Sequence, residues 1–160
     1  MSHFTPENFS ECNLGLLIGR TAVLKDMVLE THLTEYAITA AQFKVLIIME
    51  RFGVDTPAEL SRHMGLDSGS ITRMLDRLEH KDLICRRRSE TDRRQVQLLL
   101  KEEGLKLAGL LPHIGANAMN ELLGGLEPQE LQDLERILTK ILLAANDSLT
   151  ARWLGIGDER

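Results

Sequence analysis

Residues 56–80, TPAELSRHMGLDSGSITRMLDRLEH, constrain the fold most, because they contain two helix starts separated by one stop. Thr56 is a good N-cap, a proline follows at the first helical position, and a glutamate three residues after the cap completes a capping box. Gly65 ends this first helix, and Asp67 or Ser68 caps a second one. The stretch therefore predicts two short helices joined by a tight turn.

The second helix has two distinct faces. Its apolar side chains recur at spacings of three and four, which indicates a face turned toward the core: Ile71, Met74, Leu75 and Leu78. The opposite face carries Gly69, Arg73, Asp76, Arg77 and His80. A helix with this pattern is held by the core along one side and is free to meet a partner along the other.

The hydrophobic period changes to that of a strand after this helix. Residues 83–86 are predicted as a strand, residues 89–94 as a loop, and residues 95–98 alternate as a second strand. Five of the nine residues from Arg86 to Arg94 are arginines, in a chain whose formal net charge is −5. Two short helices followed by an arginine-rich hairpin form the plan of a winged helix-turn-helix, in which the second helix enters the major groove of DNA.

Longer helices are predicted on both sides of this block. Residues 11–32 carry an apolar stripe wider than one partner helix covers, which indicates packing against another chain. Thr39 and Gln42 form a capping box at the start of a helix over residues 40–51. The fold class is therefore mainly α with a small β-hairpin wing.

Two more helices are predicted after the hairpin. The first starts near residue 101 and ends at the glycines 124 and 125, and Pro112 should kink or interrupt it. The second is a long helix over residues 126–149 with a continuous apolar stripe of Leu131, Leu134, Ile137, Leu138, Ile141, Leu142 and Ala145.

Charge and composition limit the class of protein. Residues 62–94 carry nine Lys or Arg against six Asp or Glu, whereas the rest of the chain carries ten against eighteen. Charge alone fits a solvated basic face, but its position on the helices and hairpin favours a polyanionic partner. The two cysteines have no metal-site spacing, no apolar run reaches the length of a membrane span, and no secretory signal is visible. We therefore expect a soluble cytoplasmic protein that binds double-stranded DNA and no membrane.

The contacts with DNA follow from this plan. Arg73 is placed to bond guanine edges, and three hydroxyl side chains near the start of the same helix can donate to phosphates or bases. The wing loop would reach the minor groove through two arginines, and Asp92 would fix the shape of the loop by bonding a nearby arginine. The predicted DNA-binding residues are Ser68, Ser70, Thr72, Arg73, Arg77, Arg86, Arg88, Arg93 and Arg94.

The stretch TPAELSRHMGLDSGSITRMLDRLEHKDLICRRRSETDRRQVQLLL resembles the DNA-binding core of the MarR family of bacterial transcriptional regulators. The resemblance rests on A-E-L-S in the first short helix, T-R-x-x-x-x-L-E-x-K-x-L-I in the second, D-R-R in the wing and the later E-E-G. It extends less specifically over nearly the whole chain. One departure is Lys101, because the family usually has a threonine there that caps the next helix.

The resemblance implies one domain over residues 1–160, with a winged core at 37–100 and dimerisation helices at 9–33 and 101–150. It implies a homodimer that presents two reading helices about 34 Å apart to a pseudo-palindromic operator. The implied activity is that of a repressor released by a small aromatic or phenolic effector. The effector would lie in a crevice near residues of the family's first, second and fifth helices.

The sequence offers little support for catalysis, metal binding or redox sensing. The chain lacks a nucleophile with a positioned base, paired carboxylates and a phosphate loop, so we expect neither an enzyme nor a bound cofactor. The five histidines have no helical ligand spacing, so no metal site is predicted, although a zinc-sensing arrangement of His32 and His113 in a dimer is an alternative. Two further alternatives stay open: oxidant sensing through Cys12, and a winged module that binds protein.

Overall fold

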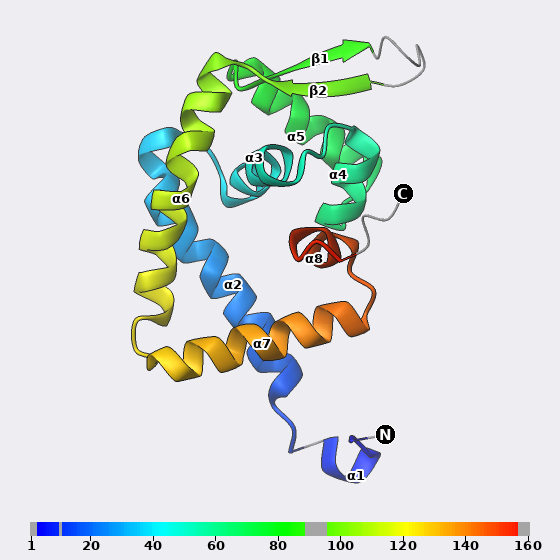
Figure 1. Cartoon of the computed structure of the whole chain (residues 1–160), viewed down its shortest axis with the longest axis vertical. Coiled ribbons are helices and arrows are strands. Elements are labelled where there is room, and N and C mark those ends of the chain that lie inside the picture. The colour runs from blue at the N-terminus through cyan, green and yellow to red at the C-terminus, as the bar shows by residue number, and fades with distance from the viewer. Residues whose placement is uncertain (1–2, 10, 89–95, 157–160) are drawn as a thin grey trace.

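The computed structural model describes residues 3–9, 11–88 and 96–156, and over these residues the chain is a helical protein with one β-hairpin (Figure 1). The elements in chain order are α1 (Pro6–Phe9), α2 (Leu14–Leu33), a 3-10 turn (Thr34–Tyr36), α3 (Ala40–Phe52), α4 (Pro57–Met64), α5 (Ser68–His80), β1 (Ile84–Arg88), β2 (Val96–Leu100), α6 (Glu102–Leu123), α7 (Pro128–Ala144) and α8 (Ser148–Trp153). Helices α2 and α6 pack side by side, and α3 packs against both of them (Figure 1). The hairpin packs on α5 at one end of the molecule.

The predicted caps organise the three helices of the winged core. The Thr39 hydroxyl accepts from the backbone N–H of Gln42, whose side chain accepts in return from the N–H of Thr39, so the predicted capping box at α3 is confirmed. At α4, Thr56 accepts from the N–H of Glu59, but the Glu59 carboxylate accepts from the Thr56 hydroxyl instead of its backbone. Only half of that predicted box is therefore formed.

Helix α5, the predicted reading helix, is held in place by its predicted apolar face. Ile71, Leu75 and Leu78 are buried in the core, and Met74 is half-buried against it. Of the two candidate caps, Asp67 fills the role, since its carboxylate accepts from the N–H of Ser70 at 2.9 Å. Asp67 and Ser68 were both possible caps from the sequence, and the geometry of the turn selects Asp67.

The hairpin is longer than the sequence predicts. Strand β1 pairs antiparallel with β2 from Ile84 opposite Leu100 to Arg88 opposite Val96, so each strand continues two residues beyond its predicted end. Ile84 and Leu98 are buried on the core side. The predicted loop at 89–94 lies outside the described residues.

The structure confirms the predicted extent of the first C-terminal helix, α6, but it divides the second predicted helix in two. Pro112 does not interrupt α6, which runs unbroken from Glu102 to Leu123. Proline removes only one backbone hydrogen bond, and six buried residues of α6 hold the helix against α2 and α3. The predicted helix over 126–149 breaks after Ala144, because Asn146 takes a left-handed conformation and Asp147 caps a new helix, α8, by accepting from the N–H of Thr150 at 2.8 Å.

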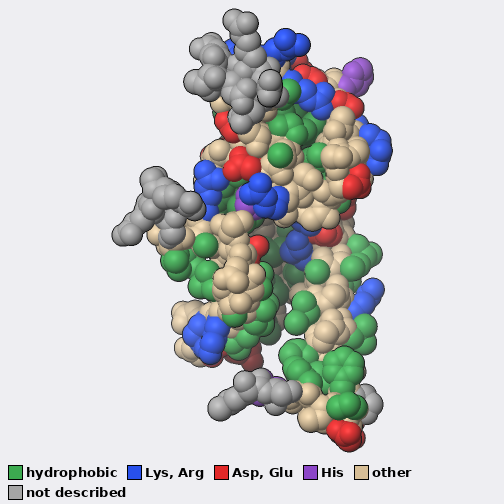
Figure 2. Space-filling model, turned by 90° about the vertical axis from the view of Figure 1, so that its right-hand side faces the viewer, with side chains coloured by type: hydrophobic (Ala, Val, Ile, Leu, Met, Phe, Trp, Pro, Cys, Tyr) green, Lys and Arg blue, Asp and Glu red, His purple; other side chains and the backbone are tan. Residues whose placement is uncertain are grey.

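Exposed apolar side chains concentrate away from the hairpin. Helix α7 has no buried residue, and large apolar side chains of both α2 and α7 are exposed: Leu14, Leu16, Leu17, Ile18, Val23, Leu24, Met27, Leu131, Ile137, Leu138, Ile141 and Leu142. Figure 2 shows hydrophobic side chains spread over the lower half of the molecule and charged side chains gathered in the upper half. Among the described helices, none combines the length and hydropathy needed to cross a membrane.

Candidate nucleic-acid interface

Helix α5 and the hairpin lie together at one end of the molecule, with α4 beside them (Figure 1). The buried stripe of α5 fixes one side of the helix. Its C-terminal end is fixed by Lys81, whose ammonium donates to the carbonyl of Ala37 and to the side chain of Gln42 at 2.9 Å. Gln42 is buried, and this bond supplies one of its partners. The reading helix is therefore locked to the start of α3 before any ligand is present.

The N-terminal turn of α5 carries a chain of polar contacts. The Asp67 carboxylate accepts from both the N–H and the hydroxyl of Ser70, at 2.9 and 2.6 Å. The Ser70 oxygen accepts from the Arg73 guanidinium at 3.1 Å. These hydrogen bonds from Ser70, the hydroxyl first, lower the pKa of Asp67 below its usual value. The exposed Arg73 is thus oriented by the helix cap.

Two of the predicted hydroxyl donors already have acceptors within the helix. The Thr72 hydroxyl donates to the carbonyl of Ser68 at 2.6 Å, and the Ser70 hydroxyl donates to Asp67. The Ser70 oxygen already accepts from Arg73 with one of its two lone pairs. Toward a nucleic acid, the role of Thr72 and Ser70 would therefore be to accept rather than to donate. Thr72 and Ser68 are exposed, as a contact with a groove requires.

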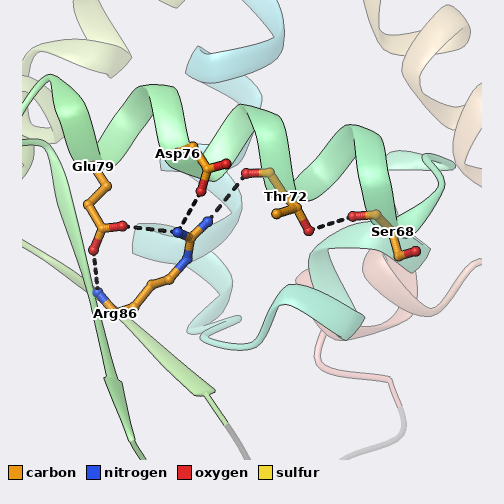
Figure 3. Close-up of polar contacts among 5 residues, drawn as sticks. All are labelled: Ser68, Thr72, Asp76, Glu79 and Arg86. Carbon is orange, nitrogen blue, oxygen red and sulfur yellow. Dashed lines mark hydrogen bonds and ion pairs between the residues drawn. The ribbon is translucent and has the colours of Figure 1, made fainter.

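Arg86, predicted as a DNA contact, is turned inward in the structure (Figure 3). Its guanidinium donates to the Asp76 carboxylate at 2.6 Å, to Glu79 at 3.0 Å and to the carbonyl of Thr72 at 3.3 Å. Sequence reasoning placed Arg86 among the DNA-binding residues, but β1 crosses close to α5 at Arg86, and the carboxylates of Asp76 and Glu79 bind its side chain. Arg86 therefore joins the hairpin to α5.

The other arginines of α5 and the hairpin are either exposed or lie outside the described residues. Arg77 on α5 and Arg87 and Arg88 at the end of β1 are exposed, and Arg73 shares the outer face of α5 with Arg77. The predicted minor-groove residues Arg93 and Arg94 and the predicted brace Asp92 lie outside the described residues. Four exposed arginines are therefore described on these two elements, two on α5 and two on β1.

Some residues of the interface were missed by sequence reasoning. Glu79 and Lys81 lie in the motif that resembles the MarR family, but sequence reasoning assigned no contact to either. In the structure they anchor β1 and α3 to α5. Lys101, which lacks the capping side chain expected there, instead pairs with Asp82, and this hydrogen bond raises the pKa of Lys101. The repeated acidic positions 76 and 79, one turn apart, were the available signal for a cationic partner.

Residues considered for other chemistry remain separate from this surface. Cys12 is half-buried in the turn before α2. His32 pairs with Glu121 of α6 at 2.8 Å. In the part of the chain that the structure describes, no group of three or more His, Cys, Asp and Glu side chains is arranged to hold a metal ion.

Comparisons with known proteins identify the family of the chain. A family model described as the MarR family matches residues 38–96. The multiple antibiotic resistance protein MarR of Salmonella typhimurium is 38% identical over 130 residues, which are 81% of this chain and 90% of the relative. The HTH-type transcriptional regulator SarZ of Staphylococcus epidermidis is 33% identical over 111 residues, which are 68% of this chain and 75% of the relative.

A solved structure extends the similarity to the whole fold. The structure of a cysteine-to-serine mutant of MarR from E. coli, complexed with operator DNA, matches with a TM-score of 0.74 and 35% identity. The match covers 87% of this chain and 99% of the E. coli chain. The similarity therefore includes the helices that flank the winged core.

Proposed function

The chain belongs to the MarR family of transcriptional regulators, and we propose that it acts as a homodimer that binds a pseudo-palindromic operator through α5 and the wing. The observation that carries this proposal is the reading helix itself. It buries Ile71, Leu75 and Leu78 on one side and exposes Arg73 and Arg77 on the other, beside a hairpin that ends in exposed arginines. The relatives of the chain are transcriptional regulators, which supports a regulator and not an enzyme.

The reading helix would supply the sequence-specific contacts. Arg73 is exposed and oriented by Ser70, so its guanidinium can form a bidentate pair with a guanine edge in the major groove. Arg77 lies one turn further along and is suited to a neighbouring base or phosphate. Thr72 and Ser68 add hydroxyl groups on the same exposed side.

The wing would supply contacts beside the groove. Arg87 and Arg88 are exposed at the end of β1, where the strand leads toward the predicted minor-groove residues Arg93 and Arg94. A narrow minor groove concentrates negative potential and attracts arginine. We keep Asp92 as the expected partner that shapes this loop.

The apolar surface of α2 and α7 supports dimerisation. Together with the end of α6 these helices line a hollow of about 460 Å³ whose walls are almost entirely apolar, including Leu17, Ile18, Leu134 and Leu138. A surface of this kind is costly to leave in water. A second copy of the chain would cover it and place two reading helices about 34 Å apart, one helical turn of DNA.

Control by a small molecule is the second part of the proposal. Two hollows lie between the winged core and the flanking helices, one of about 370 Å³ between α3 and α6 and one of about 400 Å³ bordered by α2, α3, α4 and α8. Each combines apolar side chains with charged ones, which suits a small aromatic or phenolic acid. Binding there would shift the reading helices relative to each other and release a repressor acting in the cytoplasm.

Fluorescence anisotropy with a selected operator duplex tests the proposal. Arg73→Ala should weaken operator binding by about 10- to 100-fold, because a bidentate pair contributes roughly 1–3 kcal/mol. Arg136→Ala removes the same charge from an exposed arginine of α7, whose partner is Asp133, and should change affinity by less than about twofold. Weak, sequence-blind binding by the wild-type protein would instead favour a module that binds protein.

A further inference from the structure

We propose that Arg86 is a positioning residue that holds the wing at a fixed angle to the reading helix and thereby sets which base pairs the wing can reach. This inference rests on the proposed function, because it concerns how the DNA-binding surface is built. It assigns Arg86 no contact with DNA. It gives the two acidic side chains of α5, Asp76 and Glu79, a role as the anchors of the wing.

The contacts of Arg86 span almost two turns of α5 (Figure 3). One guanidinium nitrogen donates to Asp76 and Glu79, and the other donates to the backbone carbonyl of Thr72. A planar guanidinium presents its N–H groups in a fixed fork, so three acceptors on one helix define both its position and its orientation. Lysine could replace the charge but not this geometry.

Glu79 fixes the backbone of the wing as well as the side chain. One oxygen of its carboxylate accepts from the Arg86 guanidinium at 3.0 Å, and the other accepts from the Arg86 backbone N–H at 3.1 Å. Arg86 lies opposite Leu98 in the hairpin, so its position also sets that of β2. The wing is therefore attached to α5 at two points, the tight turn at residues 81–83 and this carboxylate.

Charge explains why Arg86 is unsuited to a phosphate contact. Its side chain is only 27% exposed and already lies against two carboxylates, so a phosphate would add a third anion to a group with no net positive charge. Arg87, the next residue along the strand, is exposed and pairs with no described carboxylate. The two adjacent arginines are therefore expected to have different roles, one internal and one toward the ligand.

Arg86→Lys separates geometry from charge, and Arg87→Ala is the matched comparison. Affinity would be measured from 50 to about 300 mM salt with a duplex that the wild-type protein selects from a random-sequence pool, and with variants changed at the outer or the central base pairs. Arg86→Lys should lose about tenfold in affinity for the selected duplex and most of its discrimination at the outer pairs, with an unchanged salt slope. Arg87→Ala should lower the salt slope by about one phosphate contact and keep the discrimination.

Glu79→Gln distinguishes positioning from simple masking of charge. If Arg86 only neutralised the carboxylates, removing the negative charge of Glu79 would tighten binding to DNA. Positioning requires the opposite result, a loss of discrimination at the outer pairs similar to that of Arg86→Lys. The double variant should be no worse than either single one, because both changes break the same attachment.

Amide hydrogen exchange in the free protein tests the attachment without DNA. Arg86→Lys and Glu79→Gln should speed exchange at the backbone N–H of Arg86 and along β2, while the buried face of α5 keeps its protection. A reduced salt slope with intact discrimination and unchanged exchange would overturn the proposal and make Arg86 a phosphate contact. Faster exchange in variants of a protein that binds no selected duplex would instead support the attachment and refute the proposed function.

Discussion

Helices α5 and α7 are both amphipathic, yet they use their apolar faces in different ways. Helix α5 buries Ile71, Leu75 and Leu78 within its own chain, whereas α7 has no buried residue and exposes Ile137, Leu138 and Ile141 among others. The same sequence signal, an apolar stripe with helical spacing, therefore identifies a core helix in one place and an interface helix in the other. The difference agrees with the proposal that α5 is held by contacts within its own chain, whereas the exposed face of α7 is covered by a second copy.

The largest effect is expected from charge on the exposed apolar face of α7. Ile137→Asp with Ile141→Asp places two carboxylates in the proposed dimer interface and should produce a folded monomer, because both side chains are half exposed in one chain. Operator affinity should fall by about 100-fold or more, since each protomer then binds a half-site alone. Sedimentation velocity and anisotropy measure the two effects.

A charge elsewhere on α7 is the control for that experiment. Gln132→Asp introduces a carboxylate at an exposed polar position of the same helix and should leave both the dimer and operator binding intact. If the Ile137 and Ile141 variant stayed dimeric, the contrast between α5 and α7 would lose its physical basis.

The next largest effect is a loss of folding stability when the buried apolar face of α5 is changed. Leu75 is 1% exposed, so Leu75→Ala should lower the free energy of unfolding by about 2–5 kcal/mol through lost burial and a residual cavity. Leu138→Ala on α7, where the side chain is 41% exposed in one protomer, should act mainly on the dissociation constant of the dimer. Urea unfolding at several protein concentrations separates the two, because only the second loss depends on concentration.

A smaller effect on stability is expected where the start of α6 packs against the turn before β1. An added Cβ at Gly104 would lie 1.9 Å from the carbonyl oxygen of Leu83, so Gly104→Ala must displace backbone and should destabilise by about 1–3 kcal/mol. Gly109 lies in the same helix with open space around its Cα, and Gly109→Ala should stabilise by roughly 0.5–1 kcal/mol. Thermal unfolding of the two variants should therefore shift in opposite directions.

The smallest effect compares the caps of α5 and α8 in acid. Hydrogen bonds from Ser70 and from Thr150 lower the pKa values of Asp67 and Asp147, so each carboxylate stabilises the fold above its unfolded pKa of 3.8 and ceases to do so as the pH falls through its lower folded value. Asparagine caps a helix without titrating. Asp67→Asn and Asp147→Asn should each lose less stability than the wild type between pH 5 and about pH 2, as urea midpoints would show. Equal acid sensitivity in all three proteins would argue against these caps.

The winged core could be predicted because its signals are local. Caps at Thr39 and Thr56, glycine stops and the stripe from Ile71 to Leu78 lie within a few residues of the structure that they determine. The break between α7 and α8 was also readable, since Asn146 and Asp147 are residues that end one helix and cap another. The continuity of α6 could not be predicted from local signals, because packing against α2 and α3 outweighs the local cost of Pro112.

The sequence predicted that α5 and the hairpin form the candidate site, but it did not predict the contacts between them. Arg73 and Arg77 follow from the periodicity of α5, which places them opposite the core. Arg86 was predicted to contact DNA because the alternation of a strand does not indicate which helix crosses nearby. Its inward position depends on Asp76 and Glu79, ten and seven residues earlier, and on the angle of the turn between them.

Selection of duplexes from a random-sequence pool by the protein tests the central claim most directly. A dimer that reads DNA through two copies of α5 should enrich a two-fold palindrome whose half-site centres lie about 10 base pairs apart. Enrichment of a single asymmetric site, or of no sequence at all, would contradict the account.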